Sequence, residues 1–133
     1  MRGILLDTSA FSAHRRGHPE IGAAVKEAPS AALNAIVLGE VLHGFRAGGK
    51  LTSNLADLAR LRSVPRFRIL ALDEDTADNY ARIIVELRRA GTPIPTNDIW
   101  IAASAMQHGL EILTTDRHFL RVPTLAVRCF EPV

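Results

Sequence analysis

The sequence predicts an α/β fold, a three-layer α/β/α sandwich with a mostly parallel central sheet. Short apolar segments of strand length alternate with longer segments in which apolar residues recur every three or four positions. This alternation is typical of parallel strands joined by right-handed helical crossovers, which cover both faces of the sheet. We find no repeat, low-complexity stretch or linker, so we expect residues 1–133 to form a single domain.

The chain begins with a strand that changes directly into a helix. Residues 4–6 are apolar and end at Asp7, and the hydroxyls of Thr8 and Ser9 after it are suited to cap the helix. Ligands of parallel sheets bind outside the carboxyl ends of the strands. Asp7 therefore lies where a functional site is expected.

The middle of the chain contains three predicted helices and a strand. A proline begins the helix of residues 19–27, and a Pro-Ser pair separates it from a short apolar segment at residues 31–33. In residues 36–46 apolar side chains recur every four positions, which indicates a helix with one buried face, and two glycines end it. Leucines keep the helical spacing in residues 51–61, and a proline follows them. The mainly apolar residues 67–72 then predict a strand.

The last part of the chain contains two helices and two strands. Residues 73–90 predict the longest helix, with acids early and arginines late, as the helix dipole favours. Thr96 or Asn97 is expected to cap the next helix, which is apolar nearly all round and should therefore be central and buried. Residues 111–114 and 125–129 predict the two closing strands.

Composition excludes several classes of protein. With 47% hydrophobic and 23% charged residues, the chain has the balance of a globular protein, and no apolar run approaches the roughly 18 residues of a membrane span. The amino-terminal segment lacks the features of a signal peptide, and the single cysteine, Cys129, cannot form an internal disulfide. We expect a cytoplasmic protein with no membrane partner.

Four acidic residues stand at predicted strand ends or beside apolar helix faces. They are Asp7, Glu40, Asp98 and Asp116. An ionised carboxylate beside a core is costly unless it is paired or bound to metal, so four such placements indicate a shared acidic pocket. Hard divalent cations take oxygen ligands and work with substrate phosphate. We therefore expect a metal-dependent phosphodiester hydrolase in which the three aspartates are the main ligands and Glu40 binds a second metal or orients a water.

Each acid also has a structural explanation. Asp7 is a favoured helix N-cap residue, Asp98 stabilises a helix by about 0.3–1 kcal/mol from its first turn, and Asp116 suits a turn. Glu40 is the hardest to explain in this way, because apolar residues flank it on both sides. Taken together, the four acids favour a functional pocket over four separate structural roles.

Three runs of the sequence resemble PIN-domain proteins, most of all the VapC-type ribonuclease toxins of prokaryotic toxin–antitoxin pairs: LLDTSAF, GEVLHG and NDIWIAASAMQHGLEILTTDRHF. The resemblance covers essentially the whole chain in the family's order and spacing. It implies that the four acids form the family's metal-binding quartet and that Ser9 and Thr114 match polar positions lining the site. Independently of the resemblance, we expect Asn97, beside Asp98, to be a further supporting polar residue. It also implies dependence on Mg²⁺ or Mn²⁺, cleavage of RNA, a homodimer, and neutralisation by a cognate VapB-like antitoxin whose tail lies in or near the active groove.

The remaining charge fits a nucleic-acid partner without demanding one. If metal neutralises four of the 14 acidic residues, ten remain against 16 basic residues. Arg117 and His118, directly after the last acid, are candidates for contact with substrate phosphate. We expect His14 and His18 at the surface because Gly and Pro interrupt their helix, and Trp100 in the core or in a dimer interface.

Two alternative functions fit the same pattern: a catalytically inert PIN-type fold used as a binding scaffold, and a housekeeping single-strand nuclease. Other classes are excluded by particular residues. A phosphatase of the haloacid-dehalogenase type would carry a second Asp at the position of Ser9. Nucleotide-binding proteins of the P-loop type need a glycine-rich loop with lysine, and serine hydrolases need a G-x-S-x-G turn; the sequence contains neither.

Overall fold

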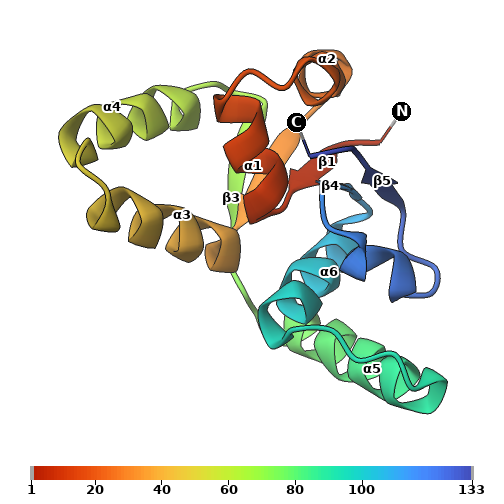
Figure 1. Cartoon of the computed structure of the whole chain (residues 1–133). Helices are drawn as coiled ribbons and strands as arrows, with labels where there is room; N and C mark the ends of the chain where they lie inside the picture. The colour runs from red at the N-terminus through yellow and green to blue at the C-terminus, as the bar shows by residue number, and fades with distance from the viewer. Residues whose placement is uncertain (1, 133) are drawn as a thin grey trace.

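Apolar segments form the strands of a parallel sheet in the computed structural model, which describes residues 2–132 (Figure 1). The strands are β1 (Ile4–Leu6), β2 (Ala31–Asn34), β3 (Phe67–Leu70), β4 (Glu111–Thr114) and β5 (Val127–Cys129). The helices are α1 (Thr8–Arg15), α2 (Pro19–Glu27), α3 (Ala35–Ala47), α4 (Leu51–Arg62), α5 (Glu74–Ala90) and α6 (Thr96–His108), with a 3-10 helix η1 (Arg117–Arg121) after β4. The predicted α/β fold is confirmed, although β3 and β5 are each shorter than we predicted.

The strand order places a reversal of the chain path between β1 and β4. The order across the sheet is β3-β2-β1-β4-β5, and all neighbours are parallel. The chain steps outward from β1 through β2 to β3, and then crosses back to lay β4 on the other side of β1. In sheets of this kind, the crevice outside the carboxyl ends of the strands at the reversal point is where ligands bind. The residues after β1 and β4 meet at this point.

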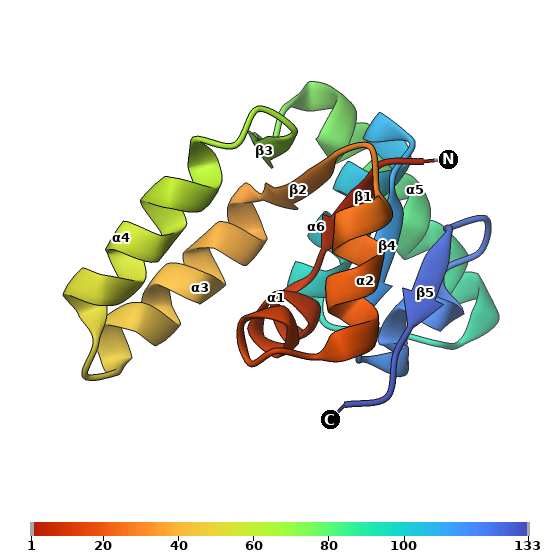
Figure 2. The ribbon, with the colours of Figure 1, turned by 90° about the horizontal axis from the view of Figure 1, so that it is seen from above.

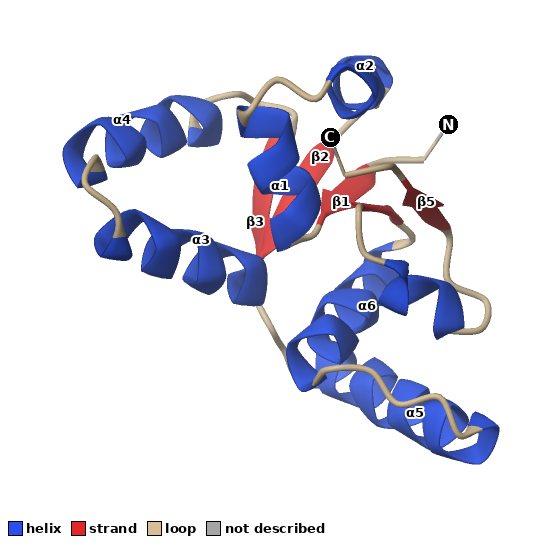
Figure 3. Ribbon diagram, viewed as in Figure 1, coloured by secondary structure: helices blue, strands red, loops and turns tan. Residues whose placement is uncertain are grey.

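Helices cover the sheet from both sides and form three layers. Right-handed crossovers that step in opposite directions place their helices on opposite faces. Helices α1 and α2 accordingly lie on one face, and α5 and α6 lie on the other (Figures 1 and 3). Helices α3 and α4 run side by side and extend outward from β2 and β3 (Figure 2). The predicted three-layer architecture is therefore confirmed.

The central strands and α6 form a large part of the core, which continues on both faces of the sheet. Leu5, Leu33 and Ile112, from three adjacent strands, have no measurable exposure, as expected of parallel strands buried on both faces. In α6, Ala102 and Ala103 are also fully buried, and their small side chains allow close approach of the helix to its neighbours. The prediction that this helix is central and buried is confirmed.

Of the candidate caps for α1, Asp7 caps the helix and Thr8 and Ser9 do not, because the side chain of Asp7 accepts a hydrogen bond from the backbone N–H of Ala10. The predicted cap of α6 is wrong. Helix α6 has no side-chain cap: Pro95 occupies the cap position with extended backbone, and its carbonyl accepts from the N–H of Ile99. The helix thus begins at Thr96, one or two residues earlier than a cap at Thr96 or Asn97 would place it.

The expectation for His18 is also wrong. His18 is buried with 4% exposure, since its Nδ1 caps α2 by accepting from the N–H of Ile21, and its Nε2 lies 2.8 Å from the carbonyl oxygen of Glu131. His14 is half-buried, and burial lowers its pKa.

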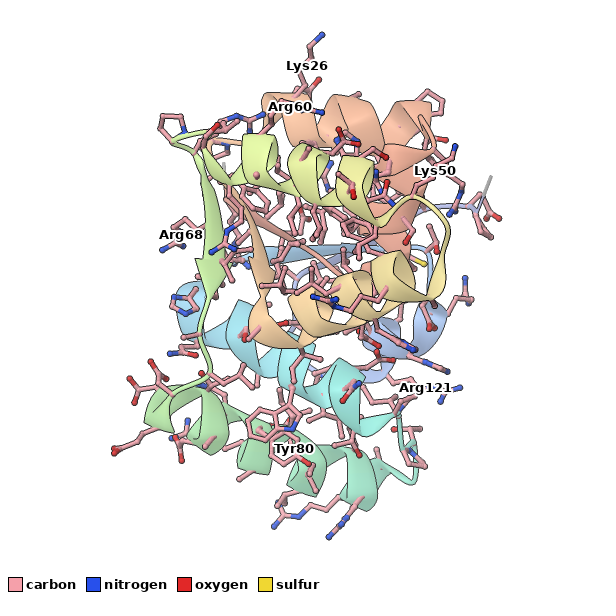
Figure 4. All side chains as sticks on the ribbon, turned by 90° about the vertical axis from the view of Figure 1, so that its left-hand side faces the viewer. Lys26, Lys50, Arg60, Arg68, Tyr80 and Arg121 are labelled. Carbon is pink, nitrogen blue, oxygen red and sulfur yellow. The ribbon has the colours of Figure 1, made fainter. Side chains whose placement is uncertain are left out.

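The aromatic residues of α5 and α6 form a stacked pair at the edge of the core. Trp100 is half-buried, and its ring lies 3.9 Å from that of Tyr80 at an interplanar angle of 18° (Figure 4).

Among residues 2–132, no helix is both long enough and apolar enough to cross a bilayer.

Candidate active site

Asp7 is held at the end of β1 by three hydrogen bonds. Its Oδ1 accepts from the N–H of Ala10 at 2.8 Å and from the hydroxyl of Ser9 at 2.7 Å, and its Oδ2 accepts from the hydroxyl of Thr114 at 2.6 Å. The residue is only 4% exposed. Burial raises the pKa of Asp7, and these hydrogen bonds oppose that rise by stabilising the charged form, while the charge of Asp98 adds to it. A buried carboxylate is thus held in one orientation.

The two hydroxyls that bind Asp7 also join the ends of β1 and β4. Ser9 accepts a hydrogen bond from the N–H of Thr115 at 3.0 Å, and Thr114 accepts from the N–H of Asp116 at 2.8 Å. Each hydroxyl therefore donates to Asp7 and accepts from the loop after β4. This arrangement fixes the loop that carries Asp116 relative to Asp7.

Asp98 and Asp116 meet across the site, with His118 between them. The Nδ1 atom of His118 lies 3.2 Å from Oδ2 of Asp98 and 3.1 Å from Oδ2 of Asp116. Ligand-type atoms of all three residues lie within 4.8 Å of one another. The other oxygen of Asp116 accepts from the backbone N–H of His118 at 2.9 Å and caps η1. Asp98 comes from the first turn of α6, so two separate segments form this cluster.

Glu40 reaches the site from the flank of α3. It is half-buried, and its Oε1 accepts a hydrogen bond from the hydroxyl of Thr8 at 2.6 Å. Thr8 directly follows Asp7, so this bond ties Glu40 to the beginning of α1. The charge of Glu40 contributes to the electrostatic environment of Asp98.

The electrostatics of the four acids indicate one shared pocket. Burial raises the pKa of Asp98 most, and the charges of Asp116 and Glu40 raise it further, while His118 lowers it. Carboxylates that disfavour one another's ionisation are stabilised by a cation placed among them. The donor set consists mainly of carboxylate oxygens, which are the ligands that hard divalent cations prefer. The residues present therefore fit a divalent metal ion.

Asn34 is a buried residue that our sequence reasoning missed. Its Oδ1 accepts from the N–H of Val37 and caps α3, while its Nδ2 donates to the carbonyl of Trp100 at 3.2 Å and to the hydroxyl of Ser104 at 3.0 Å. The side chain thus joins the helix that carries Glu40 to the helix that carries Asp98. An Asn between an apolar strand and a helix is a recognisable N-cap signal, but nothing in the sequence indicates the second contact.

The other predicted polar and basic residues, together with Thr8, lie around the acids in different surroundings. Arg117 is exposed at the beginning of η1, beside the acids. Asn97 is exposed in the first turn of α6 and does not cap that helix. Thr8, which we predicted as a possible cap, instead binds Glu40.

A pocket of about 500 Å³ adjoins the acids between α1, α3 and α4. Thr8 and Glu40 line the end of the pocket nearest the site, Phe11 and Phe45 supply apolar surface, and Arg16 adds positive charge. A chain segment that entered this pocket would pass beside Glu40.

Comparisons with known proteins agree with this geometry. The PIN domain family profile matches residues 4–125. The ribonuclease VapC5 of Mycobacterium tuberculosis is 32% identical over 115 residues, covering 86% of this chain and 84% of that protein. The crystal structure of VapBC-5, a member of the VapBC family of toxin–antitoxin systems from the same organism, superposes with a TM-score of 0.68 at 28% identity and covers 98% of both chains. The structure of DNA-bound VapBC from Salmonella typhimurium superposes with a TM-score of 0.83 at 27% identity, covering 97% of this chain and 98% of that chain.

The matched residues include β1, α3, α6 and β4, the elements that present the four acids. The chain therefore belongs to the PIN domain family, among the VapC ribonucleases.

Proposed function

We propose that the protein is a metal-dependent endoribonuclease, the toxin of a type II toxin–antitoxin system, with Asp7, Glu40, Asp98 and Asp116 as its active site. The observation that carries this proposal is the convergence of acids from distant segments at the reversal point of a parallel sheet. The relatives named ribonucleases support RNA as the substrate.

The acidic residues have different proposed roles in the site. Asp98 and Asp116, whose outer oxygens face one another across His118, would hold the cation, with Asp7 completing the set from the end of β1. When bound, Mg²⁺ or Mn²⁺ supplies Lewis-acid chemistry, which stabilises negative charge on phosphate and makes a water molecule more acidic.

The other polar residues position these acids and the substrate. Ser9 and Thr114 orient Asp7 and favour its ionised form, because both donate to its carboxylate. Thr8 holds one oxygen of Glu40, which leaves the other free to orient a water or to bind a second metal. Arg117, exposed beside the acids, would contact a phosphate of the RNA chain.

We propose a VapB-like antitoxin as the partner, acting in the cytoplasm. The solved toxin–antitoxin relative supports this partner, and the pocket between α1, α3 and α4 supports the place of its tail. A peptide there would reach Glu40 and obstruct the site. We propose a homodimer as the free toxin, and the half-buried Tyr80–Trp100 pair is the surface we would examine first.

The test is RNA cleavage by purified protein under metal control. We expect cleavage in Mn²⁺ or Mg²⁺, none in EDTA, and recovery when metal is restored in excess. Asp98→Asn should abolish cleavage, whereas Asp78→Asn, an exposed surface acid paired with Arg82, should leave it unchanged. Cleavage that continued in EDTA would refute metal dependence, and a folded wild type that binds RNA without cleaving it would favour the inert scaffold.

A further inference from the structure

Three donor atoms from two segments converge at the mouth of the site, and one of them is a nitrogen. One ligand atom from each of Asp98, Asp116 and His118 lies within 4.8 Å of the other two. The nitrogen is 3.2 Å and 3.1 Å from the two oxygens. The ring nitrogen is therefore directed at the carboxylates and not outward toward an approaching phosphate.

The spacing suits adjacent ligands of one ion. In an octahedral site with ligands about 2.1 Å from the metal, neighbouring ligand atoms at right angles are about 3.0 Å apart. The two distances from Nδ1 to the carboxylate oxygens are close to this value.

The local structure holds the imidazole in place. The backbone N–H of His118 donates to Oδ1 of Asp116, which leaves Oδ2 of the same carboxylate facing the ring. The next residue, Phe119, has no measurable exposure and anchors η1 in the core. The side chain of His118 is 37% exposed, so water has access for the remaining ligand positions.

The charge balance favours a metal ion over a simple ion pair. Asp98 and Asp116 both contact the imidazole of His118, and Asp7 and Glu40 lie within electrostatic range of Asp98. A divalent cation placed among these carboxylates offsets more of their negative charge than a singly charged partner would, and it takes the neutral imidazole as a ligand.

We infer that His118 is a direct ligand of the divalent cation, beside Asp98 and Asp116, and that this nitrogen makes the site bind Mn²⁺ more tightly than Mg²⁺. Mg²⁺ is held by oxygen ligands in near-ideal octahedral geometry and dehydrates reluctantly. Mn²⁺ also favours carboxylates, but as a first-row transition ion it accepts an imidazole nitrogen beside them more readily than Mg²⁺ does. The inference rests on the proposed metal dependence and goes beyond it, because the four acids alone would supply only oxygen.

The test is pulsed electron paramagnetic resonance of the wild-type protein loaded with one equivalent of Mn²⁺. We expect the modulation of a directly bound imidazole nitrogen, and we expect it to change when the protein is made with ¹⁵N-labelled histidine. Mn²⁺ that binds tightly but shows no histidine nitrogen would overturn this inference and leave the metal-dependent nuclease intact. Absence of Mn²⁺ binding would overturn both.

A variant gives an independent measurement. His118→Phe keeps an aromatic ring and removes the nitrogen, and we expect Mn²⁺ affinity by calorimetry to fall at least about tenfold, since even outer-shell changes cost metal sites this much. Mg²⁺ affinity should change less, so the preference for Mn²⁺ should shrink. His43→Phe, at an exposed histidine of α3, is the matched control and should bind both metals as the wild type does. An unchanged ratio of the two affinities in His118→Phe would contradict the inference.

Discussion

Replacement of Asn34 tests whether one buried amide joins the two helices that carry active-site acids. The side chain is fully buried and makes three hydrogen bonds, one within α3 and two to α6. Asn34→Ala removes the N-cap of α3, which costs about 1 kcal/mol. It also deprives the carbonyl of Trp100 and the hydroxyl of Ser104 of a buried partner, which costs roughly 1–3 kcal/mol more. The free energy of unfolding should therefore fall by roughly 2–4 kcal/mol.

Two further variants separate the cap from the bridge. Asn34→Ser keeps a good N-cap residue but is too short to reach α6, so it should lose only the bridge, roughly 1–3 kcal/mol. Ser104→Ala removes one of the two acceptors on α6 and should cost about 0.5–1.5 kcal/mol. We expect Asn34→Ser to lower kcat as well, because the spacing of Glu40 and Asp98 depends on the bridge.

The assay is urea unfolding at pH 7 in the presence of a chelator, with RNA cleavage measured on the same preparations in Mn²⁺. An Asn34→Ala protein with the wild-type urea midpoint would refute the structural role of Asn34. An Asn34→Ser protein that is less stable but cleaves at the wild-type rate would show that the bridge supports the fold without positioning the acids.

Three other predictions follow from the same site. Burial, and then the charges of Asp116 and Glu40, raise the pKa of Asp98 in the folded protein above its usual 3.8. The metal-free fold should therefore lose stability as the pH rises from about 3.8 through this higher folded pKa, because ionisation of Asp98 is less favourable in the fold than in the unfolded chain. Asp98→Asn should remove this loss of stability. In EDTA the variant should melt at a higher temperature than the wild type at pH 7 but not below pH 3.8. Equal melting temperatures at pH 7 would contradict the argument. Thr8→Val, which removes the donor to Glu40, should lower kcat by about tenfold with KM unchanged, whereas a change confined to KM would assign Thr8 to RNA binding. Mn²⁺ should raise the melting temperature of the wild type but not of Asp98→Asn, as differential scanning fluorimetry would measure. A ligand that binds only the native state stabilises it, and the effect grows with the ratio of ligand concentration to Kd.

The parts of the fold that follow local patterns were predictable from the sequence. The strand before Asp7 and the helix that begins at Pro19 have the predicted bounds, since apolar runs and proline act over a few residues. The placement of Asp7 and Asp116 at one edge of the sheet follows from the rule that parallel strands carry their ligands at the carboxyl ends.

What the sequence did not reveal depends on contacts between distant segments. Asn34 looks like an ordinary helix cap, and its bond to Ser104, 70 positions away, exists only in the folded chain. His18 was predicted at the surface because glycine and proline flank it, yet the carbonyl of Glu131 covers it. The ring of His118 turns toward two carboxylates that no local pattern brings together.

The most direct test of the central claim is anomalous X-ray scattering from crystals soaked in Mn²⁺. We predict an anomalous peak between the carboxylates of Asp98 and Asp116, at about 2.0–2.6 Å from their oxygens, as hard cations require. An ordered active site with no peak at saturating Mn²⁺, or peaks only at acids elsewhere on the surface, would contradict a metal-dependent nuclease built on these residues.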